Sequence, residues 1–136
     1  MELEHQISKD LVMRVEKLLN EVFEELYQML IAKSPVYTGE YAQSHHIDNH
    51  GLAMDYESNP QPGAVKTLSY KWKIDDNVVC FYNTSGHADV VEYIGWPQSG
   101  KPPYAVYTTT LSTFETVLAK KASKYPGLEL GASDLI

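Results

Sequence analysis

Cysteine and basic residues are both scarce in this chain. Cys80 is the only cysteine among 136 residues, which excludes an intrachain disulfide. The 11 Lys and Arg residues are outnumbered by 18 Asp and Glu residues, so the formal net charge is -7. This acidic balance argues against a protein that grips nucleic acid along a basic groove. It is compatible with a surface that DNA passes without sticking, and equally with an ordinary acidic globular protein.

Long apolar stretches are lacking as well. No run approaches the roughly 18 apolar residues that cross a bilayer, and the polar residues 1–10 are unlike a signal peptide. We therefore expect no membrane partner and synthesis in a reducing cytoplasm. Hydrophobic residues make up 43% and charged residues 21%, as in a globular protein. The length fits a single domain, which we expect at residues 1–125, followed by a flexible C-terminal tail at residues 126–136.

Motifs of enzyme chemistry are also scarce. The Gly-Lys-Ser/Thr run of a phosphate-binding loop is absent, and residues 85–87, Ser-Gly-His, read as a loop rather than a strained nucleophile elbow. Cys80 lies in the most apolar stretch, where a thiol packs as a small hydrophobe. We therefore expect no enzyme, no catalytic residue and no cofactor.

One group of histidines has the chemistry of a metal site. His45, His46 and His50 are close in sequence, and on an extended strand His46 and His50 would share a face with Asp48 between them. No second group supplies further ligands, so polar strand residues are the simpler interpretation and we expect no metal. The alternative hypothesis is a small cytoplasmic metal-dependent enzyme or regulator that uses the His45–His50 cluster.

The N-terminal part predicts a long helix. Apolar residues recur at steps of three and four from Val12 to Met29, which indicates one broad apolar face. We expect Ser8 as the N-cap, and an end near Lys33 because Pro35 disfavours the helical conformation in the residue before it. Two interpretations of the broad face stay open: a small sheet covers all of it, or part of it faces a neighbouring subunit.

The rest of the chain predicts strands followed by a helix. Residues 68–74 alternate apolar and polar side chains, and residues 78–83 form a more apolar run after a turn, so we expect an antiparallel hairpin. A short helical turn should end at Gly95. Residues 102–125 begin with proline and keep helical spacing. The predicted fold class is α+β, with a long N-terminal helix and a C-terminal helix packed on an antiparallel sheet.

Three segments resemble signatures of the small tail-component and neck proteins of tailed bacteriophages. SPVYTGEYAQS is similar to the family's PVdTG-x-L-r-x-S, YNTSGHADVVEYIG to its N…YA-x-x-vE-y-G, and KPPYAVYTTTLSTF to its proline-led final helix. The positions that carry this structural motif are Pro35, Val36, Thr38, Gly39, Ser44, Asn83, Ala88, Glu92, Tyr93, Gly95 and Pro103. The chain departs from the pattern at Tyr37, Tyr41 and His87, and Ile94 is an extra residue.

The resemblance implies a structural virion protein. It implies a ring-forming subunit, expected as a hexamer, that joins the tail tube to the head connector in the phage neck or tail-completion region. Its partners would be copies of itself, the connector, and the tail terminator or tail tube, with DNA only passing through the channel. Loops at residues 55–66 and 84–103 and the C-terminal tail would reach these neighbours. A further alternative is an adaptor-like binding module that dimerises through the first helix.

Overall fold

The protein folds as an α+β chain with one long helix at its centre. The computed structural model describes residues 2–35, 41–51, 67–86 and 88–125. Its helices and strands, in order, are α1 (Glu2–Lys33), β1 (His45–Asp48), β2 (Cys80–Asn83), the π-helical turn η2 (Val90–Ile94), the 3-10 turn η3 (Pro97–Ser99), α2 (Val106–Leu111) and α3 (Phe114–Ala122). The predicted Thr38–Gly39 turn, the 55–66 loop and the 126–136 tail lie outside the described residues.

Helix α1 has 32 residues and is about 48 Å long at 1.5 Å per residue. Its predicted end at Lys33 is confirmed: Ser34 Oγ donates to the carbonyl of Leu30 at 2.6 Å, and Pro35 follows. Its predicted start is wrong, because Ser8 lies inside the helix rather than at an N-cap. The residues before Ser8 include no Gly or Pro, so the local sequence does not stop the helix there.

The sheet consists of two antiparallel strands, β1 and β2, among the described residues. His45 is paired with Asn83 at one end and Asp48 with Cys80 at the other. The predicted hairpin of residues 68–74 with residues 78–83 is therefore wrong. Strand β2 pairs with a segment that precedes it by more than thirty residues in the chain, and residues 68–74 form no strand.

Residues 68–74 instead run along α1 and bind its polar side chains. Three backbone N–H groups donate to side-chain oxygens that are spaced one turn apart on the helix. The pairs are Leu68 with Glu24 Oε2 at 2.9 Å, Trp72 with Asn20 Oδ1 at 2.7 Å, and Ile74 with Glu16 Oε2 at 2.9 Å. Since side chains of a helix satisfy these three amides, the amides need no strand partner.

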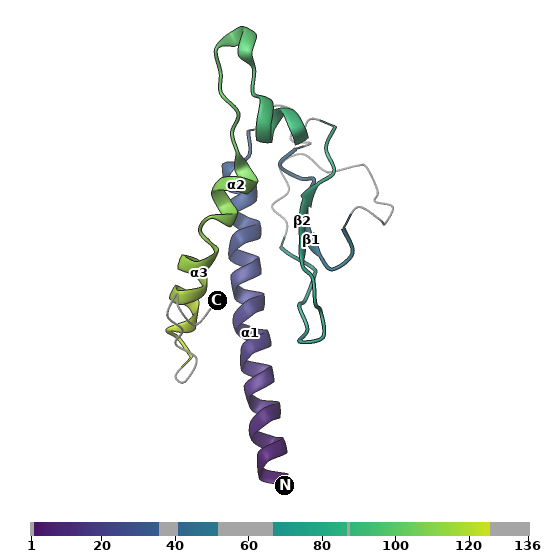
Figure 1. Cartoon of the computed structure of the whole chain (residues 1–136), viewed down its shortest axis with the longest axis vertical. Helices are drawn as coiled ribbons and strands as arrows, with labels where there is room; N and C mark the ends of the chain where they lie inside the picture. Colours follow the sequence, from purple (N-terminus) through teal and green to yellow (C-terminus); the bar gives the residue numbers. More distant parts are fainter. Residues whose placement is uncertain (1, 36–40, 52–66, 87, 126–136) are drawn as a thin grey trace.

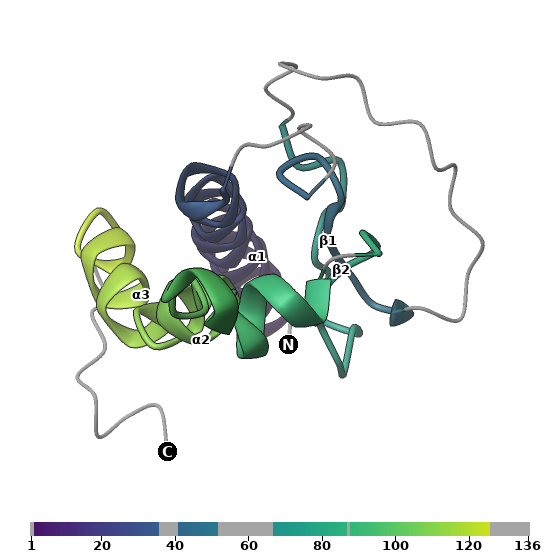
Figure 2. The ribbon, with the colours of Figure 1, turned by 90° about the horizontal axis from the view of Figure 1, so that it is seen from above.

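The main hydrophobic cluster surrounds the middle of α1. It joins side chains of α1 to β1, to the 68–74 segment and to α3; its buried members are Leu18, Val22, Phe23, Leu26, Tyr27, Ile47, Leu68, Trp72, Val117, Leu118 and Ala122. Helices α2 and α3 lie against α1 on one side, and the sheet lies on the other (Figures 1 and 2). The prediction that the C-terminal helix packs on the sheet is confirmed only in part: α3 packs on α1, whereas Tyr107 of α2 reaches the sheet, its hydroxyl lying 2.6 Å from His45 Nδ1 of β1.

The predicted C-terminal helix is broken into two pieces. It begins at Val106 rather than at the prolines, and a turn at Ser112 and Thr113 separates α2 from α3. Ser112 Oγ donates to the carbonyl of Thr109 and Thr113 Oγ1 to that of Thr110, both at 2.6 Å. These hydroxyls compete with the helical backbone pattern, which explains the break. No helix in the described ranges is long and apolar enough to cross a membrane.

Candidate functional site

The segments that resemble the phage signature converge at the C-terminal end of α1. A second hydrophobic cluster, here called the motif cluster, has Leu30, Tyr41, Val91 and Val106 as its buried members. Phe81, Ala88, Trp96 and Tyr107 pack against it. Its members come from α1, from the residues before β1, from β2, from η2 and from α2. Residues far apart in the sequence therefore share one core here.

A buried hydrogen-bond network around His45 ties these elements together. Its Nε2 atom lies 2.6 Å from Ser34 Oγ, and its Nδ1 atom lies 2.6 Å from the hydroxyl of Tyr107 and 3.1 Å from Asn83 Nδ2. The Asn83 amide is oriented by two further bonds. Its Nδ2 donates to the carbonyl of Tyr41 at 2.9 Å, and its Oδ1 accepts from the backbone N–H of Ser85 at 2.8 Å.

These partners fix the tautomer of His45. Asn83 Nδ2 is a donor only, so His45 Nδ1 accepts and the ring proton is on Nε2. Nε2–H then donates to Ser34 Oγ, whose hydroxyl in turn donates a hydrogen bond to the carbonyl of Leu30. A nucleophilic serine needs the opposite polarity, with its proton directed at an unprotonated histidine nitrogen. The Ser34–His45 pair is therefore a structural tie.

Burial governs the ionisation of His45, whose side chain is 3% exposed. Desolvation, with a smaller contribution from the nearby His46, lowers the pKa of His45 to about 3. The network therefore holds a neutral imidazole at neutral pH. Burial likewise raises the pKa of Tyr107 above its usual value, so its hydroxyl stays a donor to His45.

Glu92 caps helix α2 from a distant position in the chain. Its carboxylate is buried and accepts from the backbone N–H of Tyr107 at 2.7 Å, the N–H of Thr108 at 3.0 Å and the Thr108 hydroxyl at 2.7 Å. Residue 105, at the N-cap position of α2, is alanine and has no side chain able to cap. Glu92 thus satisfies free N–H groups of the first turn and places negative charge at the positive helix end.

Gly95 permits a close backbone crossing beside this cap. Its φ is +69°, and a Cβ atom there would lie 2.5 Å from the backbone N of Pro103 and 2.7 Å from the carbonyl O of Lys101. Trp96 and Lys101 exchange backbone hydrogen bonds at 2.8 and 3.1 Å, which closes a projecting hairpin around η3. This hairpin extends from the upper end of the molecule in Figure 1. The predicted helical turn ending at Gly95 is confirmed as η2.

The other motif residues take varied positions. Pro35 is buried after α1, and Ser44 is buried with its carbonyl accepting from the N–H of Thr84 at 3.0 Å. Tyr93 is 73% exposed. Val36, Thr38 and Gly39 lie outside the described residues, as does His87. Sequence reasoning missed the partners of His45, Ser34 and Tyr107, because neither belongs to a recognisable motif.

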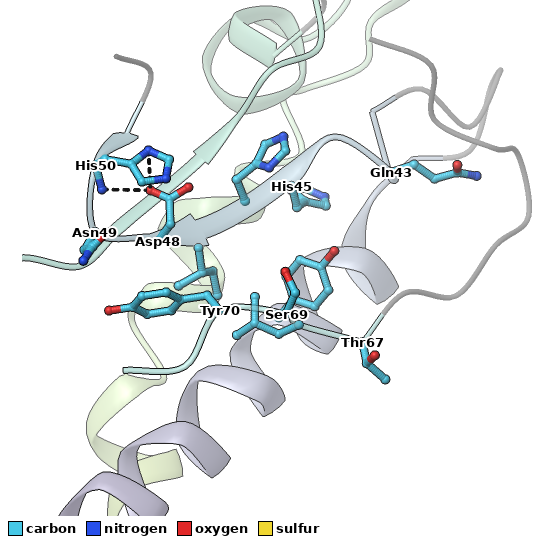
Figure 3. A pocket seen from close by; sticks show the side chains of 12 residues that line it. Gln43, His45, Asp48, Asn49, His50, Thr67, Ser69 and Tyr70 are labelled. Carbon is cyan, nitrogen blue, oxygen red and sulfur yellow. Dashed lines mark hydrogen bonds and ion pairs between the residues drawn. The ribbon is translucent and has the colours of Figure 1, made fainter. Parts of the chain in front are cut away.

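The three histidines do not form the arrangement expected of a metal site. Strand β1 ends at Asp48, whose Oδ1 accepts from the N–H groups of His50 and Gly51, so the chain turns away before His50. His50 Nδ1 lies 3.5 Å from Asp48 Oδ1 (Figure 3). His46 instead stacks on Tyr82. Within the described part of the chain, no three His, Cys, Asp or Glu side chains are grouped to hold a metal.

A separate apolar pocket of about 340 Å³ opens beside the motif cluster. It lies between β2, η2 and α2, and its walls include Phe81, Tyr82, Tyr107 and the exposed Tyr93 and Leu111. The pocket is also lined by the polar side chains of Asn83, Asp89 and Glu92.

Searches of protein-family models, of curated proteins and of solved structures found no match to this chain.

Proposed function

We propose that this chain is a structural virion protein of a tailed bacteriophage. It forms a ring in the neck or tail-completion region, expected as a hexamer, and joins the tail tube to the head connector. The observation that carries the proposal is the motif cluster. Among the described positions that resemble the family signature, Ala88 packs against this small core, and Asn83, Glu92 and Gly95 each have a specific structural task beside it.

The geometry favours assembly over catalysis. The Ser34–His45 pair has the polarity of a structural tie, and Glu92 is fully engaged as a helix cap. The large apolar and aromatic side chains that are exposed near the cluster are Tyr93, Ile94, Tyr104 and Leu111. Exposed aromatic and apolar side chains gathered at one end of a chain are typical of a protein-binding surface. DNA would pass through the ring without base contacts, in keeping with the acidic net charge.

The proposal is tested by quantifying the chain in purified particles. Phage particles are banded from a lysate of the strain that carries the gene, and the chain is measured by mass spectrometry against a major tail protein. We expect about six copies per particle, as one cyclic ring requires. A chain that is abundant in the lysate but absent from banded particles would remove the proposal.

Light scattering of the purified protein with and without a chelator tests the metal-dependent alternative. The ring proposal predicts that the mass is indifferent to the chelator. A mass that falls when metal is removed would favour the His45–His50 cluster instead, because the metal would then hold the subunits or the fold together.

A further inference from the structure

The 340 Å³ pocket beside the motif cluster combines aromatic rings with carboxylates. Five of the ten described residues that line it are aromatic, namely Tyr41, Phe81, Tyr82, Tyr93 and Tyr107. Two more, Asp89 and Glu92, carry carboxylates, and none of the ten is Lys, Arg or His. The faces of aromatic rings are electron-rich and attract cations. The described lining is therefore complementary to a positively charged group.

Neither carboxylate at the pocket has a cationic partner among the described side chains. Glu92 is buried, and its three donors, two backbone N–H groups and the Thr108 hydroxyl, are all neutral. The positive end of α2 offsets part of its charge. Asp89 is exposed beside it. Since buried charges in proteins are as a rule paired, a ligand that brings a positive charge would be stabilised here.

Tyr41 gives a second and independent indication of a ligand. Its side chain lines the pocket and is 6% exposed, yet its hydroxyl has no hydrogen-bond partner in the described part of the chain. Burial, with a smaller contribution from the charge of Glu92, raises the pKa of this hydroxyl, so the hydroxyl lies within electrostatic range of that carboxylate. A buried hydroxyl without a partner is costly, and a ligand N–H could donate to its oxygen.

We propose that this pocket binds the side chain of an arginine that belongs to a partner protein. A guanidinium group is planar, so it stacks on an aromatic ring while its N–H groups reach acceptors around its edge. Tyr93, which is 73% exposed, offers the ring face. The Asp89 carboxylate and the Tyr41 hydroxyl offer the acceptors. A lysine ammonium has no flat face and would use the negative charge alone.

The occupant is a residue of a polypeptide rather than the free amino acid. No basic side chain in the described lining could bind the α-carboxylate of free arginine. The volume also lies at the small end of the range for ligand pockets, about 300–1,000 Å³, which suits a single side chain. This inference goes beyond the proposed ring, because all the groups that it uses belong to one chain.

An NMR titration of the isotopically labelled protein with short peptides tests the pocket. The probe is a tripeptide of arginine between two glycines, blocked at both ends, which should shift the backbone amides of Phe81, Tyr93 and Leu111 with a Kd of about 1 mM. Three comparison ligands should bind at least about fivefold more weakly. They are the same peptide with lysine, the same peptide with citrulline, which is a neutral isostere of arginine, and free arginine.

Two variants locate the binding. Asp89→Asn and Tyr93→Ala should each raise the Kd of the arginine peptide at least about threefold, because one removes a charge and the other a ring face. Both positions are exposed, so the fold should be kept, as the amide spectrum would show. Asp75→Asn is the charge-matched control, since Asp75 is exposed and is not among the residues that line the pocket. Its Kd should equal that of wild type.

Several outcomes would overturn the inference. One is an arginine peptide that shifts none of the pocket amides up to about 20 mM. Others are a Kd that Asp89→Asn and Tyr93→Ala leave unchanged, or a comparison ligand that binds as tightly as the arginine peptide. The copy number in particles tests the proposed function separately, because the titration needs no ring.

Discussion

Acidification should destabilise this fold through one residue, His45. Its pKa is about 3 in the folded chain, against roughly 6.5 for an unperturbed histidine. The unfolded chain therefore binds one more proton than the folded chain between these two values. Stability contributed by the neutral imidazole is fully present above about pH 6.5 and is lost as the pH falls toward 3.

The size of the effect follows from the same two pKa values. A pH of about 5 lies roughly 1.5 units below the pKa of the histidine in the unfolded chain, but above its pKa in the folded chain. Protonation of the unfolded chain therefore lowers the free energy of unfolding by about 2 kcal/mol. That is a large part of the total for a domain of this size, which is about 5–15 kcal/mol. Protonation of Nδ1 would also direct a new N–H at Asn83 Nδ2, which is itself a donor, and the Tyr107 hydroxyl would have to turn from donor to acceptor.

Urea unfolding of wild type and His45→Gln at about pH 7.5 and about pH 5 measures this loss. His45→Gln should be less stable at the higher pH but should lose about 2 kcal/mol less than wild type on acidification. His50→Gln, at an exposed site, is the matched control and should lose as much as wild type. Equal losses in wild type and His45→Gln would refute the assignment of a buried neutral imidazole.

Substitutions at three further residues test other contacts. Glu92→Ala should cost about 2 kcal/mol by removing the cap of α2, and Glu92→Gln less, because an amide oxygen still accepts; equal costs would contradict a role for the charge. Gly95→Ala should cost at least about 2 kcal/mol, since its Cβ overlaps the Pro103 backbone; a neutral result would contradict that close approach. Asn20→Ala should cost about 1–2 kcal/mol and expose Trp72, whose backbone it binds twice, so an unchanged Trp emission would count against the contact.

Features that depend on local sequence were predicted well. The apolar period of α1 and its end before Pro35 need only neighbouring residues, and both are confirmed. The turn that ends at Gly95 has the same local origin. The predicted N-terminal boundary of α1 was wrong. A residue such as Ser8 caps the start of a helix only where the residues before it disfavour the helical conformation.

Features that depend on distant partners were predicted poorly. Residues 68–74 alternate as a strand does, but their N–H groups are satisfied by α1, more than forty residues earlier. His45 lies on the same face of β1 as the buried Ile47, because side chains on a strand alternate between its two faces. This alternation indicates a buried His45 rather than a metal ligand. Nothing in the sequence indicates that Glu92 caps a helix that begins at Val106, because the contact arises from the backbone crossing at Gly95.

Labelling of intact particles tests the central claim most directly. Gold-labelled antibodies raised against the purified chain are applied to phage particles and to tailless heads, and the label is located by electron microscopy. The account predicts label at the junction of head and tail, on one ring per particle. Label confined to the tail tip or the capsid surface, or no label on particles that contain all other virion proteins, would contradict it.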